Sequence, residues 1–384
     1  MANLRTTAHT FIGIFAIPLW VGLLALPFTG LRDAVWVAAA AVLGMFLWKM
    51  RKADVVADIR TRVKETFVKV SPSFSGIARY SSAPATYAFL VFFLIILPLF
   101  LNDYYVDIMT LTGMYIVLAL GLNIVVGQAG LLNLGYVAFY AIGAYTYAIL
   151  STTIGLSFWS GLIAGGLVAA LFAVLLGMPI LRLRGDYFAI VTLGLGEITR
   201  IVLNNWSALT GGPNGISKIG RPMIAGYELH RTLDFYYLIL VIVIITVFAL
   251  HRLIASRIGR AWIAIREDEI AAEAMGVNTF QLKLLAFVLA SALAGVVGVF
   301  FSAKMAFVSP ESFTFFESVL ILCMVVLGGM GSIAGIILGA LLLVMLPEIF
   351  RDFQDYRMLA FGIALVLMMV FRPQGLLGAV KKTG

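Results

Sequence analysis

The sequence predicts an all-α fold, a polytopic membrane helix bundle of about 10–12 membrane segments. Three observations lead to this prediction. The 384 residues are 62% hydrophobic and 12% charged, whereas soluble domains average about half apolar and about a quarter charged. Apolar stretches close to the roughly 20 residues that a membrane helix needs recur along the whole chain. Lysine and arginine gather in alternate connecting loops, as membrane topology requires.

Twelve apolar stretches are the predicted segments, some of them short or broken at glycine-rich turns. Arg5 precedes the first stretch, as in a secretory signal, but the run is long and no small-x-small cleavage site follows it before Arg32. We therefore expect it to stay in the membrane. In chain order the stretches are 11–28, 34–48, 86–101, 108–126, 134–150, 158–181, 187–203, 235–251, 282–303, 317–330, 336–350 and 358–371.

The net charge of +8 follows topology and does not indicate binding to nucleic acid. If loop 49–85 is cytoplasmic, alternation of the segments places 19 of the 27 lysines and arginines inside and seven outside, with Arg200 within a segment. An excess of basic residues in cytoplasmic loops is what sets the orientation of a membrane protein. We therefore expect both termini and loop 252–281 in the cytoplasm, and loop 204–234 outside.

Four regions are predicted along the chain. Residues 1–48 form a two-helix membrane unit, and 86–377 form the main transmembrane domain, which a cytoplasmic tail follows at 378–384. Between the first two, the basic linker 49–85 carries apolar residues at roughly helical spacing, which is typical of an amphipathic helix on the inner membrane surface. A solvated linker that is basic only for topology is the alternative.

Two glycine-rich interruptions break the apolar pattern. The stretch "GLNIVVGQAGLLNLGYVAFYAIGAY" begins at Gly121 and contains Asn123, Gln128 and Asn133, and "MVVLGGMGSIAGIILGALLLV" contains Gly328 and Gly331. Irregular backbone at membrane depth must be buried in protein or line a watery cavity. Paired interruptions of this kind indicate an internal repeat with the substrate path at its interface. Two tight hairpins that pack small residues without touching substrate are the alternative.

Few ionisable residues lie inside the predicted segments, where they are costly and therefore candidates for function. Glu197 and Arg200 are three residues apart and can pair on one helix face; we favour a structural ion pair over a substrate contact. Glu317 begins a segment, so we expect it near the membrane interface. The three histidines are far apart in sequence, and no nucleophile motif occurs, so the sequence indicates neither a metal site nor an enzyme.

The loop 252–281 is predicted to bind a partner that supplies energy. No phosphate-binding P-loop motif occurs in the chain, so any ATP hydrolysis belongs to another subunit. Ile258, Trp262 and Ile265 share one face of a short amphipathic helix, and we expect Trp262 and Ile265 to anchor it in a groove of an ATPase. Gly259 and Gly276 would bound this helix. An interfacial helix without a partner is the alternative.

Six motifs together resemble the LivM-type permeases of bacterial high-affinity branched-chain amino acid ABC importers, over roughly residues 102–377. The motifs are the first glycine-rich stretch above, "LTGGPNGI", "RIGRAWIAIREDEIAAEAMGVN", "FVSPESFTFFES", "VVLGGMGSIAG" and "FRPQGLL". The resemblance implies an ABC importer permease fold that moves leucine, isoleucine and valine across the inner membrane. The first 48 residues and the linker resemble the extension of the longer members.

The same resemblance implies partners and site residues. The partners are a homologous second permease of the LivH type, two ATPases of the LivG and LivF type, and a periplasmic binding protein. This chain would bind no cofactor, since ATP and magnesium belong to the ATPases. The coupling loop of such permeases has the pattern E-A-A-x-x-x-G, which Ala271, Ala272 and Gly276 match; Ile270 stands at the Glu position, with Glu269 one residue earlier.

A self-sufficient secondary transporter or channel for a small polar solute is the alternative function. Such a protein normally has a charged or ion-binding centre deep in the bundle. Only Glu197 with Arg200 is available for that role, so the sequence favours the ABC permease.

Overall fold

The computed structural model describes residues 92–349 except 184 and 225, together with residue 362. The chain divides into two compact units, 1–94 and 95–384, and every element below belongs to the second. Outside the described residues lie the predicted segments 11–28 and 34–48, the segment 358–371 except for residue 362, residues 86–91 of the segment 86–101, the linker 49–85 and the tail 378–384.

Helices dominate the described part of the chain. Two short antiparallel strand pairs accompany them, β1 (Ile216–Ser217) with β4 (Phe307–Val308) and β2 (Met223–Ile224) with β3 (Tyr227–Glu228). The helical elements are η1 (Leu97–Phe100), α5 (Asp103–Asn123), η2 (Ile124–Gln128), α6 (Val137–Ile154), α7 (Phe158–Ile180), α8 (Asp186–Asn205), α9 (Ser207–Thr210), η3 (Gly212–Asn214), α10 (Thr232–Ala255), α11 (Arg257–Glu267), α12 (Glu269–Ala274), α13 (Thr279–Met305), η4 (Pro310–Phe313), α14 (Phe315–Gly328) and α15 (Ile333–Ile349).

Five of the described helices are long and apolar enough to cross a membrane: Asp103–Gln128, α6, α7, α10 and α13. Two shorter apolar helices, Phe315–Gly328 and Ile333–Met345, accompany them. The predicted segment 187–203 is also helical, as α8. A mostly helical membrane bundle, with some segments short, is therefore confirmed for the described residues.

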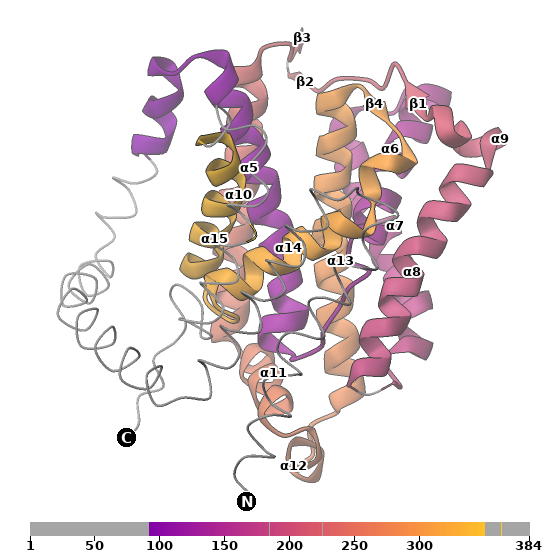
Figure 1. Ribbon diagram of the computed structural model, residues 1–384, viewed down its shortest axis with the longest axis vertical. Helices are drawn as coiled ribbons and strands as arrows, with labels where there is room; N and C mark the ends of the chain where they lie inside the picture. Colours follow the sequence, from indigo (N-terminus) through magenta and orange to yellow (C-terminus); the bar gives the residue numbers. More distant parts are fainter. Residues whose placement is uncertain (1–91, 184, 225, 350–361, 363–384) are drawn as a thin grey trace, which may run out of the picture. The chain divides into compact units, whose positions relative to one another are not determined.

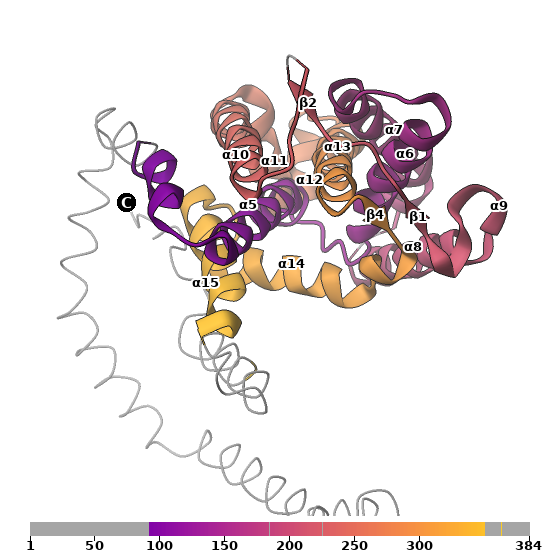
Figure 2. The same ribbon diagram turned by 90° about the horizontal axis from the view of Figure 1, so that it is seen from above.

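Helix α13 forms the centre of the packing, against α5, α6 and α7, as Figures 1 and 2 show. Small residues let these backbones approach closely, which is how membrane helices associate. A side chain at Gly143 of α6 would collide with the backbone of Gly295 on α13, and one at Gly295 would lie 2.6 Å from Ala169 Cβ on α7. Substituting either glycine would therefore force these helices apart.

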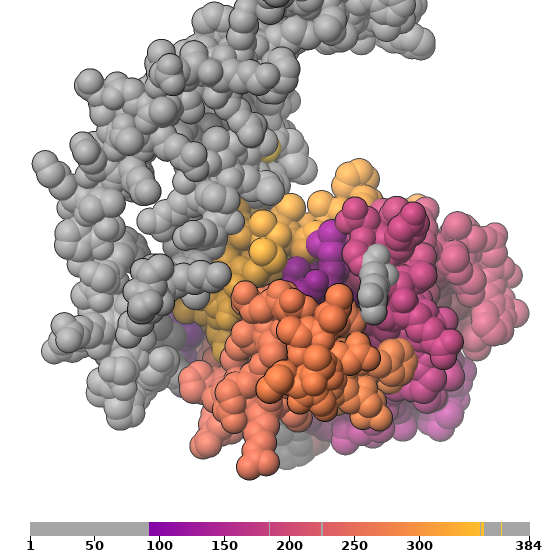
Figure 3. Space-filling view, turned by 90° about the horizontal axis from the view of Figure 1, so that it is seen from below, coloured from indigo at the N-terminus to yellow at the C-terminus, as the bar shows by residue number. Residues whose placement is uncertain are grey.

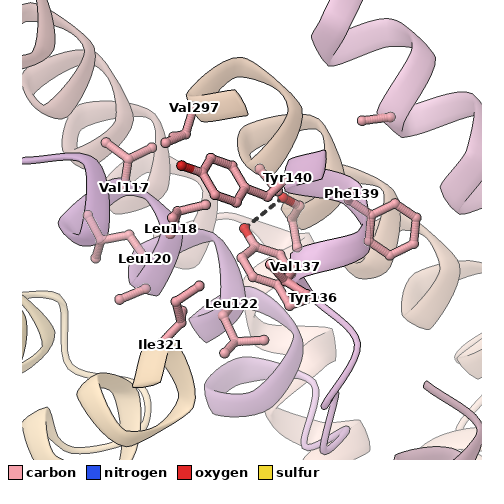
Figure 4. Packing of buried hydrophobic residues seen from close by; sticks show 14 of the residues in the cluster. Val117, Leu118, Leu120, Leu122, Tyr136, Val137, Phe139, Tyr140, Val297 and Ile321 are labelled. Carbon is pink, nitrogen blue, oxygen red and sulfur yellow. Dashed lines mark hydrogen bonds between the residues drawn. The ribbon is translucent and has the colours of Figure 1, made fainter. Parts of the chain in front are cut away.

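Aromatic and aliphatic side chains fill the space between α5, α6 and α13 (Figure 4). The Tyr136 hydroxyl, fully buried just before α6, donates a hydrogen bond to the Ala290 carbonyl of α13 at 2.9 Å. The rings of Phe139 and Phe287 meet edge to face, 5.2 Å between centroids. These contacts hold the start of α6 against the middle of α13.

The two long loops lie at opposite ends of this unit. The strands and α9 are at the top of Figure 1, whereas α11 and α12 are at the bottom. Because α10 connects the two ends, loop 204–234 and loop 252–281 lie at opposite ends, as alternation of the segments requires.

Candidate functional site

The first glycine-rich stretch interrupts the helices at the lower end of α5. After Asn123 the chain makes one π-helical turn, Ile124–Gln128, a feature frequent at functional sites. It then turns at Gly130, which has φ +76°, and stays irregular until α6 begins at Val137. Val125, Gly127 and Ala129 are buried. Gly130 and Leu132 of the same stretch are exposed, so protein encloses this irregular backbone only in part.

The second glycine-rich stretch lies directly against the first. Between α14 and α15 the chain turns through Gly329 and Gly331, with φ of +104° and +91°. The Gly331 N–H donates to Asn123 Oδ1 at 2.8 Å, and Gln128 Nε2 donates to the Gly331 carbonyl at 3.2 Å. Both backbone groups of Gly331 are thus paired by amide side chains of the first stretch. We call residues 123–130 together with 328–332 the paired turns.

Gly328 serves packing between the two helices that flank the second turn. A Cβ on Gly328 would lie 2.5 Å from the Gly335 carbonyl oxygen of α15. The sequence indicated a pair of related interruptions, and the structure brings four of the seven predicted path residues into the paired turns: Asn123, Gln128, Gly328 and Gly331.

Asn133 lies apart from the paired turns, at the start of α6. Its Oδ1 accepts a hydrogen bond from the Gly135 N–H at 3.0 Å. The neighbouring Leu134 N–H donates to Thr192 Oγ1 of α8 at 3.1 Å. The Asn133 amide nitrogen is buried and has no hydrogen-bond partner, so one strong donor remains available there.

Glu197 and Arg200 form the ion pair that their spacing predicts. Arg200 Nε donates to Glu197 Oε2 at 3.0 Å on α8, and each side chain is about one third exposed, 36% and 32%. This hydrogen bond joins the two side chains to each other and not to the paired turns. This geometry fits the interpretation of Glu197 and Arg200 as a structural ion pair that does not contact substrate.

The predicted amphipathic helix in loop 252–281 is present, but its apolar face points into the chain itself. Trp262 of α11 is fully buried, and its Nε1 donates to the Leu282 carbonyl of α13 at 2.7 Å; Ile265 is 4% exposed. The prediction that Trp262 and Ile265 anchor in a groove of an ATPase is therefore wrong. These side chains, with the half-buried Ile258, hold α11 against the membrane helices.

Capping residues and glycines shape the loop. Ser256 Oγ caps α11 by accepting from the Ile258 and Gly259 N–H groups, and Asp268 Oδ1 caps α12 by accepting from Ile270 and Ala271. Gly276, with φ +85°, ends α12 as expected. Gly259 instead lies inside the first turn of α11, where a Cβ would collide with the carbonyl of Ile254.

Arg266 connects this loop with the paired turns, a role that the sequence reading missed. Its guanidinium Nη1 donates to the Gly127 carbonyl. A Cβ on Gly130 would lie 2.7 Å from Arg266 Cγ, and one on Gly331 would lie 3.5 Å from Nη1. One side chain of α11 therefore bonds the first of the paired turns, with its guanidinium close to Gly331 of the second. In the sequence Arg266 is one of several charges on the polar side of a helix, so its pattern carried no signal.

The outer surface of the loop is formed by α12. The Lys283 ammonium, 8% exposed, pairs with Glu269 at 2.5 Å and fixes α12 to α13, and Ala272 is buried beside it. Ile270 and Met275 are 70% and 85% exposed. The loop that contains them forms part of the salmon and orange surface at the front of Figure 3. Exposed apolar side chains among charges are a signal for partner binding, and only the structure shows that these two are exposed.

The chain is similar to known permeases over most of its length. Residues 104–371 match the family model of the permease component of branched-chain amino acid transport systems. The chain is 50% identical over 295 residues to the high-affinity branched-chain amino acid transport system permease protein LivM of Escherichia coli (strain K12), covering 71% of this chain and 69% of that protein. Over 369 residues it is 46% identical to the LivM protein of Salmonella typhimurium, covering 84% and 87%.

The chain also resembles a second kind of permease. It is 28% identical over 287 residues to the high-affinity branched-chain amino acid transport system permease protein LivH of Escherichia coli (strain K12), covering 70% of this chain and 92% of that protein. No solved structure matches the chain significantly.

Proposed function

The chain belongs to the permease components of branched-chain amino acid ABC transport systems, and from this we propose that it carries leucine, isoleucine and valine across the bacterial inner membrane. It is a multi-pass membrane protein and a transport subunit, not itself catalytic. The observation that carries the proposed mechanism is the hydrogen bond from Arg266 to the Gly127 carbonyl of the paired turns, with the guanidinium close to Gly331.

The paired turns act as the inner gate of the path. They hold the lower ends of α5 and α14 together through only two side-chain hydrogen bonds, from Gln128 and to Asn123. Such bonds contribute about 0.5–1.5 kcal/mol each, so a modest movement can separate the turns. A shift of α11 pulls on the Gly127 carbonyl through Arg266, and the gate opens.

The force on α11 comes from an ATPase bound at α12. Ile270 and Met275, exposed among charged neighbours, are the apolar contacts for that partner, and Ala271 and Gly276 lie between them. Because Lys283 with Glu269 and the buried Trp262 fix the loop to α13, motion at this surface reaches the membrane helices.

The assembly contains a homologous second permease, two ATPases that bind ATP and magnesium, and a periplasmic binding protein. Similarity of this chain to LivH as well as LivM supports a pair of related permeases. Loop 252–281 faces the cytoplasm and loop 204–234 faces the periplasm, with both termini in the cytoplasm. The opposite placement of the loops (Figure 1) and the basic bias support this orientation. The domain boundaries at 48, 85 and 377 stay predictions.

Replacing Arg266 by alanine tests the mechanism. In proteoliposomes that hold the complete importer, we expect Arg266→Ala to lower leucine uptake roughly tenfold while ATP hydrolysis continues, because a hydrogen bond from a charged donor contributes about 1.5–3 kcal/mol. Arg257→Ala is the matched control, since Arg257 is exposed on the same helix. Normal coupling of uptake to hydrolysis in the Arg266 variant would contradict the proposed role of this contact.

A further inference from the structure

Helix α14 begins inside the bundle. It crosses the middle of the described helices in Figures 1 and 2, after β4 and η4 have led the chain inward from the top of the bundle. In its first turns, Ser318 Oγ accepts a hydrogen bond from the N–H of Val137, the first residue of α6, at 3.1 Å. The starts of α6 and α14 therefore meet within the bundle, where their N-terminal dipoles favour negative charge.

Glu317 lies in the first turn of α14, away from the membrane interface where its sequence position predicted it. The Tyr115 hydroxyl donates to Glu317 Oε2 at 2.7 Å. Tyr115 is near the middle of α5 (Asp103–Asn123), so the Glu317 carboxylate is held at mid-length of a membrane helix. The prediction of an interfacial position is therefore wrong, because β4 and η4 carry the start of α14 inward.

Glu317 has no cationic partner among the residues that the structure describes. Two other carboxylates on the helices have a cationic partner: Asp107 pairs with Lys304 at 2.7 Å, and Glu197 pairs with Arg200 at 2.9 Å. An ionisable group within a membrane bundle without an opposite charge is expensive and indicates a function. A carboxylate that a tyrosine hydroxyl orients is suited to a cation that arrives from outside the chain.

Aromatic rings lie beside this carboxylate. Phe313, four residues before Glu317, contacts the rings of Tyr140 at 5.0 Å and Tyr145 at 6.1 Å between centroids. The Tyr145 hydroxyl and the Asn133 amide nitrogen are the two buried side-chain polar atoms without a hydrogen-bond partner in the described part of the chain. Of the two, Tyr145 contacts Phe313, so the surroundings of the carboxylate combine apolar surface with one free donor.

These features match the chemistry of a zwitterionic amino acid. We propose that Glu317, oriented by Tyr115, receives the α-ammonium group of the amino acid as it passes through the bundle, while the rings of Tyr140 and Phe313 contact its apolar side chain. The free hydroxyl donor of Tyr145 serves its carboxylate. This site rests on the proposed function, since it requires that branched-chain amino acids cross this chain.

The test compares two conservative substitutions in the complete reconstituted importer. Glu317→Gln keeps an acceptor for the Tyr115 hydroxyl but removes the charge, whereas Glu311→Gln makes the same change at an exposed position on η4. We expect Glu317→Gln to lower leucine uptake roughly tenfold or more, because hydrogen bonds to charged groups are the strong ones. ATP hydrolysis stimulated by the binding protein should persist, and Glu311→Gln should equal the parent.

A second measurement needs no variant. In the detergent-purified complex without binding protein, leucine should slow hydrogen exchange around Tyr115 and Glu317, whereas 4-methylpentanoate, which lacks the ammonium group, should not. The proposed site would be overturned if the two compounds slowed hydrogen exchange equally, or if Glu317→Gln took up leucine as fast as the parent. If instead the parent complex imports no branched-chain amino acid, the proposed function fails and not this inference alone. If Glu317→Gln does not assemble, the comparison of the two compounds decides.

Discussion

Gly127→Ala is the substitution that most directly disturbs the paired turns. The added methyl group would lie 2.7 Å from the Gly331 backbone nitrogen and 2.9 Å from Asn123 Cγ, inside the ordinary carbon contact distance of about 3.5–4.0 Å. Asn123 would have to move, which breaks the 2.8 Å hydrogen bond that its Oδ1 accepts from Gly331. The substitution thus separates the two turns without removing any charged group.

The expected loss of stability follows from these contacts. Leaving a buried polar group unpaired costs about 1–3 kcal/mol, and overpacking costs about 1–3 kcal/mol. Alanine is favoured over glycine in a helix by about 1 kcal/mol, which offsets part of the cost. Taking the middle of each range, we expect Gly127→Ala to lose about 3 kcal/mol, and the gate to leak or to close poorly.

Thermal unfolding of the purified permease and leucine uptake by the reconstituted importer measure the two effects. Gly194→Ala is the matched control, because Gly194 lies in α8 and a Cβ there meets nothing within 4 Å. The control should be as stable as the parent or up to about 1 kcal/mol more stable, with normal uptake. If Gly127→Ala behaves like Gly194→Ala in both assays, the contact between the turns has no role in stability or transport.

The remaining predictions concern the loop and the topology. Trp262→Ala should destabilise the permease by about 3–5 kcal/mol through the cavity it leaves, seen as a lower unfolding temperature before any partner is added. Ile270→Asp, at a 70% exposed position, should leave folding intact but weaken retention of the ATPases by roughly tenfold or more; normal retention would place the partner elsewhere. A single cysteine at Arg260 should be protected from labelling outside intact cells and one at Lys218 should be labelled, and the reverse pattern would invert the topology.

Sequence patterns predicted the long apolar helices well, because their burial in lipid requires only composition and length. The segment predicted over 235–251 is part of α10, Thr232–Ala255, and the one predicted over 282–303 is part of α13, Thr279–Met305. The boundaries extend further than predicted because the helices continue past the apolar window into polar residues such as Arg252 and Gln281.

The direction of an amphipathic face and the position of a helix start could not be predicted. The periodicity of Ile258, Trp262 and Ile265 is the same whether the apolar face contacts an ATPase or the membrane helices of its own chain. Glu317 begins an apolar run, which fits a helix that starts at the interface equally well as one that starts inside the bundle. In both cases the missing information is which elements pack against one another in the fold.

In the paired turns, too, the sequence could not predict which residues bond to each other. Glycines and amides indicated two irregular, buried turns that belong together. The bond between Asn123 and Gly331 joins residues 208 positions apart, and no local pattern encodes such a pairing. Arg266 was missed for the same reason, since its partner Gly127 lies 139 positions earlier.

The central claim is that this chain imports branched-chain amino acids only when an ATPase drives it through the loop. The most direct measurement is uptake of radiolabelled leucine into proteoliposomes with the permease pair, the ATPases and the binding protein, energised either by ATP or by a proton or sodium gradient. We predict uptake with ATP and none with either gradient. Gradient-driven uptake by the permease without the ATPases would contradict the account and identify a secondary transporter.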